Sequence, residues 1–560
     1  MFVQWKIDRI KTNNIQNYLQ NKLVRPISTT FSRFDMYPSS QRNIYLVIFQ
    51  AIRSRYLTPQ HTKKLRRSSN CSATFLENHM LKFGLNRLNY AVSSGLVKSQ
   101  KRSIYTRLPL KWSTSHITYR EDQVPRNTDV LVIGGGIMGW ATAFWLRRDS
   151  KFSVTVVEKD PTYSQSATVL GLGSIRQQFS EPENIQMSLF SIGFLRNVSN
   201  YLSVEDPTES IDIGFNPQGC LMLANAENVD LLKENYLLQI DLGAKVELLT
   251  KDDLSARWPW MNVDDIEMGC YGYENEGWFD PFLLLKALKI KCHFMGVNYV
   301  VGEVTDFHAS PFIMVSSSGG ESQRPPVLCK PLRSATISLP NQMNISISFN
   351  SVVNAAGPWA AHVAELAEIG SENLPLRLPV EPRYRQIFVV RPKNTLCHME
   401  SHYPLPGLDM PFMIDHNRLF IERRDLSGEF IVYSDNPKFD SLNNNCNKQN
   451  SVNHELFHEY IQPLLCKRIP GFKDAEVTSG WISICDYNTW DQNLIIGSHP
   501  LHTNMYFCNG SSGHGTQHAI AIGKSISELI AFQQYKTFDL VRFSFDRLFS
   551  NQTVNEVNCF

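Results

Sequence analysis

The sequence predicts an α/β fold in which a Rossmann-type domain is interleaved with an α+β domain built on a mostly antiparallel sheet. Three observations support this prediction. An apolar run beginning at Asp129 leads through a glycine-rich turn into a helical pattern, and two further strand-to-turn sequences begin near Ser351 and Asn504. Between them lie two blocks with alternating apolar and polar residues, the pattern of strands that bury one face.

The folded part of the chain follows a basic N-terminal region. Residues 1–120 contain 21 Lys and Arg but only three acidic residues, whereas the remainder of the 560-residue chain contains 34 basic and 50 acidic residues. A basic, serine-containing, acid-poor region ahead of an enzyme-like pattern is typical of a transit peptide. A disordered nucleic-acid-binding arm has a similar charge pattern. We favour import, and therefore expect a mitochondrial targeting leader with a disordered extension over residues 1–120 and no nucleic-acid partner.

Hydropathy argues against a membrane-spanning protein, and cysteine spacing argues against a structural zinc or iron–sulfur site. The apolar stretch at residues 44–52 is interrupted by Gln50 and is well short of the ~20 residues of a membrane span. We therefore expect a soluble or peripheral protein. The eleven cysteines are scattered singly and form no CxxC pair, so we expect reduced thiols and no metal site.

The first element is a dinucleotide half-site. Residues 129–133 form an apolar strand, Gly134-Gly135-Gly136-Ile137-Met138-Gly139 has the spacing GxGxxG, and an amphipathic helix is expected over 140–147. In this motif the first glycine turns sharply, the second admits a pyrophosphate, and the third allows close helix packing. A second strand at 154–157 ends in Glu158 and Lys159, which we assign to the adenosine side. The half-site itself does not distinguish FAD from NAD.

Two later elements favour a flavin. The strand at 351–354 runs into a small-residue turn containing Ala356 and Gly357, and the strand at 504–510 is followed by Gly513-His514-Gly515 and a helix over 516–530. Glycines there leave room for a flat ring, and the helix directs its positive end toward it. With the first motif, these segments resemble the D-amino-acid oxidase and glycine oxidase superfamily, which includes sarcosine oxidase and dimethylglycine dehydrogenase, over residues 129–530. The resemblance implies an FAD cofactor.

Five shorter segments are similar to one mitochondrial branch of that superfamily. The similarity implies residence in the matrix or at the matrix face of the inner membrane, and a role in assembling respiratory complex I with its subunits or assembly factors as partners. The segments are residues 162–165, 176–180, 182–186, 486–489 and 512–515.

The resemblance also implies the domain boundaries. A substrate domain covers the flavin, the segment 278–288, in which Asp280-Pro281 opens a helix, returns the chain to the FAD fold, and the strand containing Val304 contacts the adenine. The expected FAD-binding domain is 128–194, 271–370 and 473–535; the substrate domain is 195–270 and 371–472; residues 536–560 are a C-terminal tail.

The candidate catalytic residues are Arg176, His514, Gln517 and Tyr487. Arg176 lies in a loop from which relatives bring an arginine to the flavin, where it could bind a carboxylate or polarise the ring; a surface salt bridge is the alternative. His514 lies between two glycines at the expected ring. We expect Arg383-Tyr384-Arg385 to be a solvated strand end.

Two departures from the superfamily pattern concern mechanism. Residues 167–172 contain no histidine where dimethylglycine dehydrogenase attaches its flavin, so we expect noncovalent FAD, with Cys485 as the possible exception. Gln517 stands where sarcosine oxidase has a lysine that grips the substrate carboxylate, and a neutral amide is a weaker anchor.

Two functional hypotheses remain open at this stage. The first is an oxidoreductase that takes a hydride from an amine-type or related substrate. The second is a non-catalytic assembly factor for complex I subunits in which FAD stabilises the fold by mass action. An NAD enzyme is a more distant alternative.

Overall fold

The structure is a computed structural model, and it describes residues 124–204, 210–314, 327–372, 374–393, 404–425, 427–439 and 452–557. The leader expected over residues 1–120 lies outside these ranges. All the described residues belong to one compact unit.

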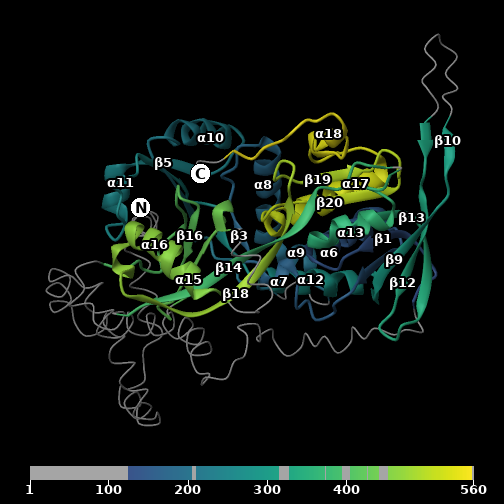
Figure 1. The fold of residues 1–560 in the computed structure, drawn as a ribbon, viewed down its shortest axis with the longest axis horizontal. Coiled ribbons are helices and arrows are strands. Elements are labelled where there is room, and N and C mark those ends of the chain that lie inside the picture. Colours follow the sequence, from purple (N-terminus) through teal and green to yellow (C-terminus); the bar gives the residue numbers. More distant parts are fainter. Residues whose placement is uncertain are drawn as a thin grey trace, which may run out of the picture. The chain divides into compact units, whose positions relative to one another are not determined.

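The first sheet has a parallel centre, as the glycine-rich motif predicts. Its main path runs through β19 (Ile495–Ser498), β20 (Met505–Asn509), β13 (Asn344–Asn354), β1 (Asn127–Ile133), β2 (Val154–Glu158) and β8 (Asn298–Val301). Figure 1 labels β19, β20, β13 and β1 of this sheet. The pairs from β20 to β8 are parallel, whereas β19 is antiparallel to β20. The beginning of β13 carries an antiparallel extension of β12 (Leu332–Ser338) and β9 (Glu303–Ala309), and a separate pair joins β10 (Phe312–Met314) to β11 (Val327–Cys329).

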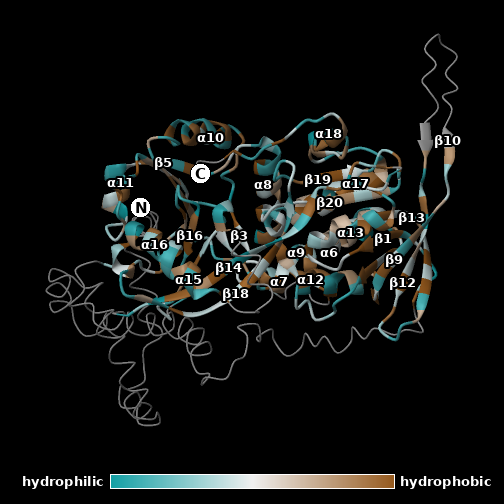
Figure 2. Cartoon of the chain, viewed as in Figure 1, coloured by the Kyte–Doolittle hydropathy of each residue, from teal (hydrophilic) through white to brown (hydrophobic). Residues whose placement is uncertain are grey.

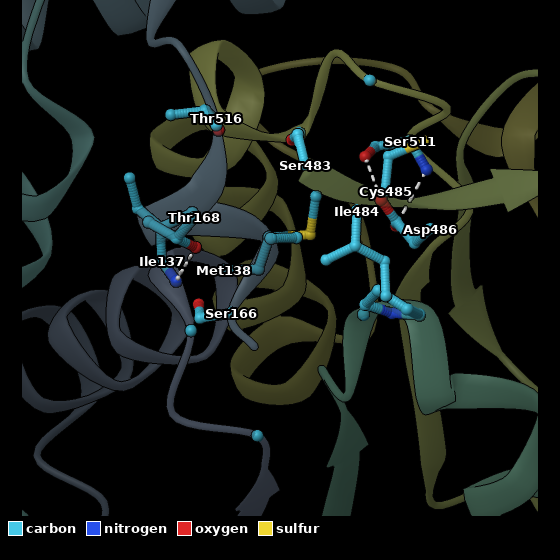
Figure 3. A pocket seen from close by; sticks show the side chains of 18 of the residues that line it. Ile137, Met138, Ser166, Thr168, Ser483, Ile484, Cys485, Asp486, Ser511 and Thr516 are labelled. Atoms are coloured by element: carbon cyan, nitrogen blue, oxygen red, sulfur yellow. Dashed lines mark hydrogen bonds between the residues drawn. The ribbon is translucent and has the colours of Figure 1, made fainter. Parts of the chain in front are cut away.

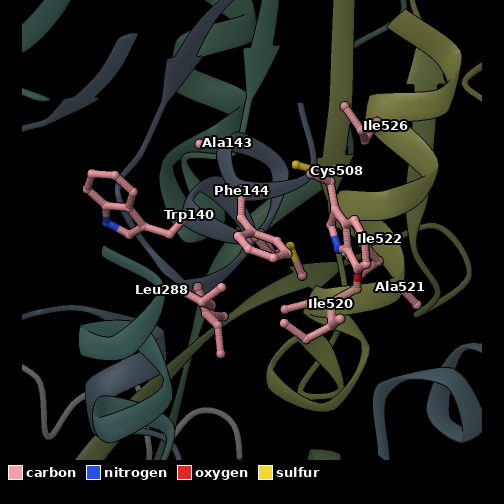
Figure 4. Close-up of a cluster of buried hydrophobic side chains, with 14 of the residues drawn as sticks. Trp140, Ala143, Phe144, Leu288, Cys508, Ile520, Ala521, Ile522 and Ile526 are labelled. Atoms are coloured by element: carbon pink, nitrogen blue, oxygen red, sulfur yellow. Dashed lines mark hydrogen bonds between the residues drawn. The ribbon is translucent and has the colours of Figure 1, made fainter. Parts of the chain in front are cut away.

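Successive side chains of the central strands enter two different cores. Val130 and Val132 of β1 face one cluster with the helices α6 (Ile137–Trp145), α12 (Pro281–Phe294) and α17 (Gly515–Phe532), part of which is drawn in Figure 4. Leu131 and Ile133 face the other, with β12 and α13 (Ala360–Leu366). This alternation follows from the two-residue period of a strand. Both faces of the parallel sheet are therefore covered.

Helix α6 differs from the expected amphipathic helix over 140–147. All nine of its residues are buried, and the chain then continues into a π-helical turn at Leu146–Ser150. The reason is its position between the sheet, α12 and α17. A helix enclosed on every side carries no polar face.

The second sheet confirms the predicted mostly antiparallel domain. Its path is β18 (Ala475–Asn488), β14 (Val380–Pro392), β17 (Phe430–Ser434), β16 (Leu419–Glu422), β15 (Phe412–Ile414), β4 (Cys220–Ala224), β6 (Met268–Gly272) and β5 (Val246–Thr250), with only β15 and β4 paired in parallel. Apolar residues line its strands and the adjoining helices α10 (Val229–Asp241) and α16 (Gln462–Arg468), as the hydropathy colouring in Figure 2 shows. Strand β18 pairs with β14 in this sheet, although it lies within the segment 473–535 that we expected in the FAD-binding domain.

Smaller elements join the two sheets. After β2 come α7 (Ala167–Leu170), a short pair of β3 (Ser174–Ile175) with β7 (Gly277–Trp278), and the helices α8 (Pro182–Arg196) and α9 (Val198–Leu202). Helix α11 (Lys251–Arg257) follows β5. None of the helices in the described ranges combines the length and apolarity of a membrane span.

Residues 536–557, here called the C-terminal segment, pack onto the body of the protein. The segment contains the 3-10 turn Val541–Phe543 and α18 (Asp546–Phe549), and it buries Phe543 and Phe545. Arg547 forms a buried ion pair with Asp491, at 2.9 Å from Nε to Oδ2. Asp491 also accepts the backbone N–H of Val554 at 3.0 Å.

Candidate functional site

One cavity of about 680 Å³ brings most of the sequence-predicted site residues together. It begins at the turn between β1 and α6, passes the ends of β2 and β13, and continues beneath β14 and β18 to the start of α17. Figure 3 shows part of its wall, with Thr168 and Thr516 near α6 and with Cys485 and Asp486 on β18. The expected residues that line it are Gly134, Gly136, Glu158, Lys159, Val304, Ala356, Gly357, Gly513, His514, Gly515, Thr516, Arg176 and Gln517.

The glycines of the first turn divide into two kinds. Gly134 has φ +100°, and a Cβ there would lie 2.3 Å from the carbonyl oxygen of Ala355; a Cβ on Gly139 would lie 1.9 Å from that of Gly134. These two glycines serve the fold, because the backbone itself fills the space. Gly136 differs, since the nearest atom to its hypothetical Cβ is the Thr168 hydroxyl oxygen at 3.6 Å. Gly136 faces the cavity, where a phosphate group approaching the helix N-terminus would lie.

Glu158 closes this end of the cavity. Its Oε2 accepts the backbone N–H of Gly135 at 2.7 Å, and its Oε1 accepts that of Asp160 at 2.8 Å. Burial raises the pKa of Glu158, and these amide hydrogen bonds oppose the rise. Gly135 itself does not line the cavity; its amide instead holds the carboxylate. The neighbouring Lys159 lines the cavity but directs its ammonium to Glu303 at 2.6 Å.

The other end of the cavity is formed by the residues around the start of α17. His514 is the N-cap of this 18-residue helix, and a Cβ on Gly515 would lie 2.5 Å from the Ser511 hydroxyl oxygen and 2.7 Å from Cε of Met138, so a larger residue there would displace these side chains. Ser511 is held by Asp486, whose carboxylate accepts its N–H at 3.0 Å and its hydroxyl at 2.6 Å (Figure 3). The positive end of the helix dipole is therefore fixed at the cavity wall.

Arg176 and His514 lie close together around Phe179. The Arg176 guanidinium carbon lies 4.9 Å from the centre of the Phe179 ring, and the His514 ring lies 5.3 Å from it. Burial, with the nearby guanidinium, lowers the pKa of His514 well below its usual value. The imidazole is therefore neutral at physiological pH.

Arg176 is buried, so it does not form the surface salt bridge that was the alternative to a role at the flavin. It is 4% exposed, and no acceptor among the described residues lies within hydrogen-bonding distance of its Nε. The side chain of Gln517, 3% exposed, accepts the backbone N–H of Arg176 at 3.0 Å. Gln517, expected at the position of a lysine in sarcosine oxidase, thus holds the loop that carries Arg176.

Tyr487 is the one candidate catalytic residue that the cavity lining does not include. It lies two residues beyond Cys485 on β18, where the Arg383 guanidinium carbon is 3.3 Å from the centre of its ring. This contact keeps both side chains within the second sheet. Of the expected solvated strand end at 383–385, Arg385 lines the cavity, because β14 is an inner strand rather than an edge.

Cys485 does line the cavity. Burial raises the pKa of its thiol to about 12. At neutral pH the thiol is protonated, and a protonated thiol is a poor nucleophile.

Several residues that line the cavity were not predicted from the sequence. Phe420, Tyr433 and Asp435 come from β16, β17 and the turn after them, and Arg418 pairs with Asp435 at 2.8 Å. Glu556 comes from the C-terminal segment. The alternation of β14, β16 and β17 could have indicated the sheet residues, but nothing local marks Glu556.

Comparisons with known proteins agree with this geometry. The profile of the family described as FAD dependent oxidoreductase matches residues 129–529. FAD-dependent oxidoreductase domain-containing protein 1 of Xenopus laevis is 41% identical over 476 residues, covering 83% of this chain and 91% of that protein. The protein of the same name from Bos taurus is 37% identical over 456 residues, covering 80% and 88%.

A solved structure shows the same fold. The L-proline dehydrogenase of P. horikoshii superposes with a TM-score of 0.59 at 21% identity, covering 77% of this chain and all of that one. The matched region contains both sheets and the whole glycine-rich series. This chain belongs to the FAD-dependent oxidoreductase family of the D-amino-acid oxidase type.

Proposed function

We propose that this protein oxidises a small amine-type substrate that carries an anionic group, with noncovalently held FAD accepting a hydride at flavin N5. The observation that carries this proposal is the buried Arg176 in the cavity. A buried charge is costly unless an opposite charge or strong acceptors satisfy it. A substrate carboxylate would supply both, in the planar geometry that a guanidinium recognises.

The residues of the cavity fit an FAD molecule along its length. The Gly134–Gly136 turn and the start of α6 would hold the pyrophosphate, Glu158 the ribose, and Val304 the adenine side. The turn at Gly513–Thr516 would lie at the ring, where the α17 dipole stabilises the negative charge of the reduced cofactor. The protein's own part is orientation and electrostatics, since the cofactor carries the chemistry.

Anaerobic mixing of the purified, FAD-loaded protein with candidate amines tests the proposal. We expect amino acids or N-alkyl amino acids that fit the cavity to bleach the flavin absorption, and Arg176→Met to abolish the reaction without loss of FAD. Arg383→Met is the matched control, because it removes an arginine that does not line the cavity. Full FAD occupancy without reduction by any amine would favour the non-catalytic assembly factor instead.

Sarcosine is expected to be a poor substrate. The resemblance to sarcosine oxidase implies two cations at the substrate carboxylate, and here Gln517 leaves Arg176 as the anchor. Losing one charge in a buried site is expected to cost about 2–5 kcal/mol of binding. Millimolar sarcosine should therefore reduce the flavin very slowly, and Gln517→Lys should accelerate the reduction whereas Gln517→Met should not. Rapid reduction of the native protein would contradict this prediction.

The flavin is expected to be released when the protein is denatured. The Cys485 thiol is protonated at neutral pH, and residues 167–172 offer no histidine. Acid precipitation should leave a colourless pellet and a yellow supernatant. A yellow pellet from the native protein and a colourless one from Cys485→Ser would show a cysteinyl flavin and refute the prediction.

We also propose that the protein acts in mitochondria and takes part in complex I assembly. The basic, acid-poor composition of residues 1–120 supports import, and the similarity of the five short segments supports the assembly role. A fusion of residues 1–120 to a fluorescent protein should enter mitochondria. Depletion of the protein should reduce assembled complex I, and rescue by Arg176→Met would show whether oxidation is needed for that role.

A further inference from the structure

The backbone and the side chain of Arg176 are held in different ways. Its N–H donates to the Gln517 side chain at 3.0 Å, and its carbonyl accepts the Ser188 hydroxyl at 2.6 Å. The guanidinium forms no ion pair with any carboxylate that the structure describes, and its Nε has no hydrogen-bond acceptor among these residues. Instead, the guanidinium carbon lies over the Phe179 ring, 4.9 Å from its centre. A ring therefore stands where a buried cation would ordinarily have a counter-ion.

Two carboxylates next to this loop bind amides rather than the guanidinium. Glu276, 1% exposed, accepts the N–H of Gln177 at 2.6 Å through Oε1 and the side-chain amide of Gln178 at 2.7 Å through Oε2. Glu556 accepts the side-chain amide of Asn184 at 2.7 Å through Oε2. These hydrogen bonds fix the loop between β3 and α8 and the first turn of α8. They leave the orientation of the guanidinium to its contact with the ring.

The Phe179 ring is itself fixed by its surroundings. The side chain is completely buried, and the His514 ring meets it edge-on, with centres 5.3 Å apart and planes at 85°. The His518 ring lies 5.1 Å from it at 48°. The Phe179 carbonyl accepts the Gln239 side-chain amide at 3.1 Å. The ring thus holds one position against the start of α17, and it presents a face to Arg176.

We propose that Phe179 is a positioning residue, whose ring holds the Arg176 guanidinium toward the cavity without neutralising it. Arg176 lines the cavity and Phe179 does not, so the ring acts on a ligand only through the arginine. An aromatic face attracts a cation without occupying its N–H donors as a carboxylate does. The guanidinium therefore keeps its charge and its donors for the anionic group of a substrate. The inference rests on the proposed function, because it takes that group to bind Arg176.

A pair of isosteric probes isolates binding to the guanidinium. 3,3-Dimethylbutanoate and 3,3-dimethylbutanamide have the same shape, but only the first is an anion, and neither has an amine that the flavin could oxidise. Each is titrated into the FAD-loaded full chain, and the perturbation of the flavin absorption band gives its Kd. The variants are Phe179→Leu, which removes the ring, Phe179→Tyr, which keeps it, Arg176→Met, and the double variant of Arg176→Met with Phe179→Leu.

We expect Phe179→Leu to weaken the binding of 3,3-dimethylbutanoate roughly fivefold or more, because a guanidinium without the ring must be ordered again when the anion binds. The Kd of the amide should stay within about twofold of the native value, and Phe179→Tyr should retain most of the affinity for the anion. In the Arg176→Met background, Phe179→Leu should have no further effect, since a residue that acts through Arg176 loses its effect together with it.

Phe457→Leu is the matched control, because Phe457 is equally buried, packs against Phe388 and does not line the cavity. It should lower the stability of the protein without changing either Kd. Should Phe179→Leu fail to retain FAD, Phe179→Met, whose unbranched side chain fills more of the same space, is measured in its place.

Three results would overturn the inference: an unchanged Kd for the anion in Phe179→Leu, an equal loss of both probes, or the same loss with and without Arg176. In each case the ring would be ordinary core packing. Failure of the proposed function appears separately, as binding of 3,3-dimethylbutanoate that Arg176→Met alone leaves unchanged.

Discussion

Gly136→Val is expected to abolish FAD retention while the protein stays folded. Gly136 has φ −71°, which valine adopts readily, and its hypothetical Cβ meets no atom closer than 3.6 Å. The added methyl groups would occupy the space that the pyrophosphate needs at the start of α6. The purified variant should be colourless, with a far-ultraviolet circular dichroism spectrum matching that of the native apoprotein.

Three further variants accompany this one. Gly139→Val should fail to fold, because its side chain would enter the backbone of Gly134. Gly193→Ala should behave as the native protein, since nothing lies within 4 Å of the added methyl group. Glu158→Ala should weaken FAD binding by about 1.5–3 kcal/mol, the value of hydrogen bonds to a charged group, roughly a tenfold to hundredfold change in Kd. Full flavin occupancy of Gly136→Val would remove the basis for this half-site.

Asp491→Ala is expected to destabilise the protein by about 3–5 kcal/mol, because it leaves the buried Arg547 without the carboxylate of its ion pair. Arg547 is 3% exposed, and Asp491 accepts from Nε and Nη2 of its guanidinium as well as from the backbone N–H of Val554. Denaturant unfolding monitored by flavin fluorescence gives the change. Limited proteolysis should then cut within residues 536–557.

The matched control is Asp230→Ala, which breaks the exposed pair with Lys233. Exposed pairs contribute less than about 1 kcal/mol, so this variant should unfold almost as the native protein does. Equal stability of Asp491→Ala and the native protein would show that the C-terminal segment contributes little to the body.

The parts of the fold that could be predicted are those specified by neighbouring residues. The expected strands at 154–157 and 504–510 correspond to β2 and β20, and the helix expected over 516–530 is α17, which spans Gly515–Phe532. Each is marked by a β-branched or apolar run next to glycines. Strand β18 lies in the segment 473–535 that we expected in the FAD-binding domain, yet it pairs with β14, whose paired residues lie 83 to 108 positions earlier in the chain, and the sequence of one strand does not identify its partner.

In the candidate site, too, the predictable residues are those placed by their neighbours in the sequence, and the others are placed by contacts with distant parts of the chain. The turn glycines and Glu158 lie within one strand-turn-helix unit, and their positions in the cavity follow from that unit. Arg385, Arg418 and Glu556 reach the cavity only through tertiary packing, and their local sequences resemble those of ordinary surface residues. Gln517 could be recognised as a lost cation, but its hydrogen bond to Arg176 joins residues 341 positions apart and was not foreseeable.

The distance along the chain between the partners of β1 also affects how the protein is made. Strand β2 follows β1 closely, whereas β13 begins more than 200 residues later, and β20, which pairs with β13 on its other side, comes near the end of the described chain. During synthesis the edge of β1 that pairs with β13 stays unpaired while the ribosome adds more than 200 residues, and unpaired apolar strand edges promote aggregation. Nascent chains of this protein should therefore depend on chaperones more than those of a protein whose neighbouring strands are consecutive, and supplying FAD should rescue only chains that are already complete.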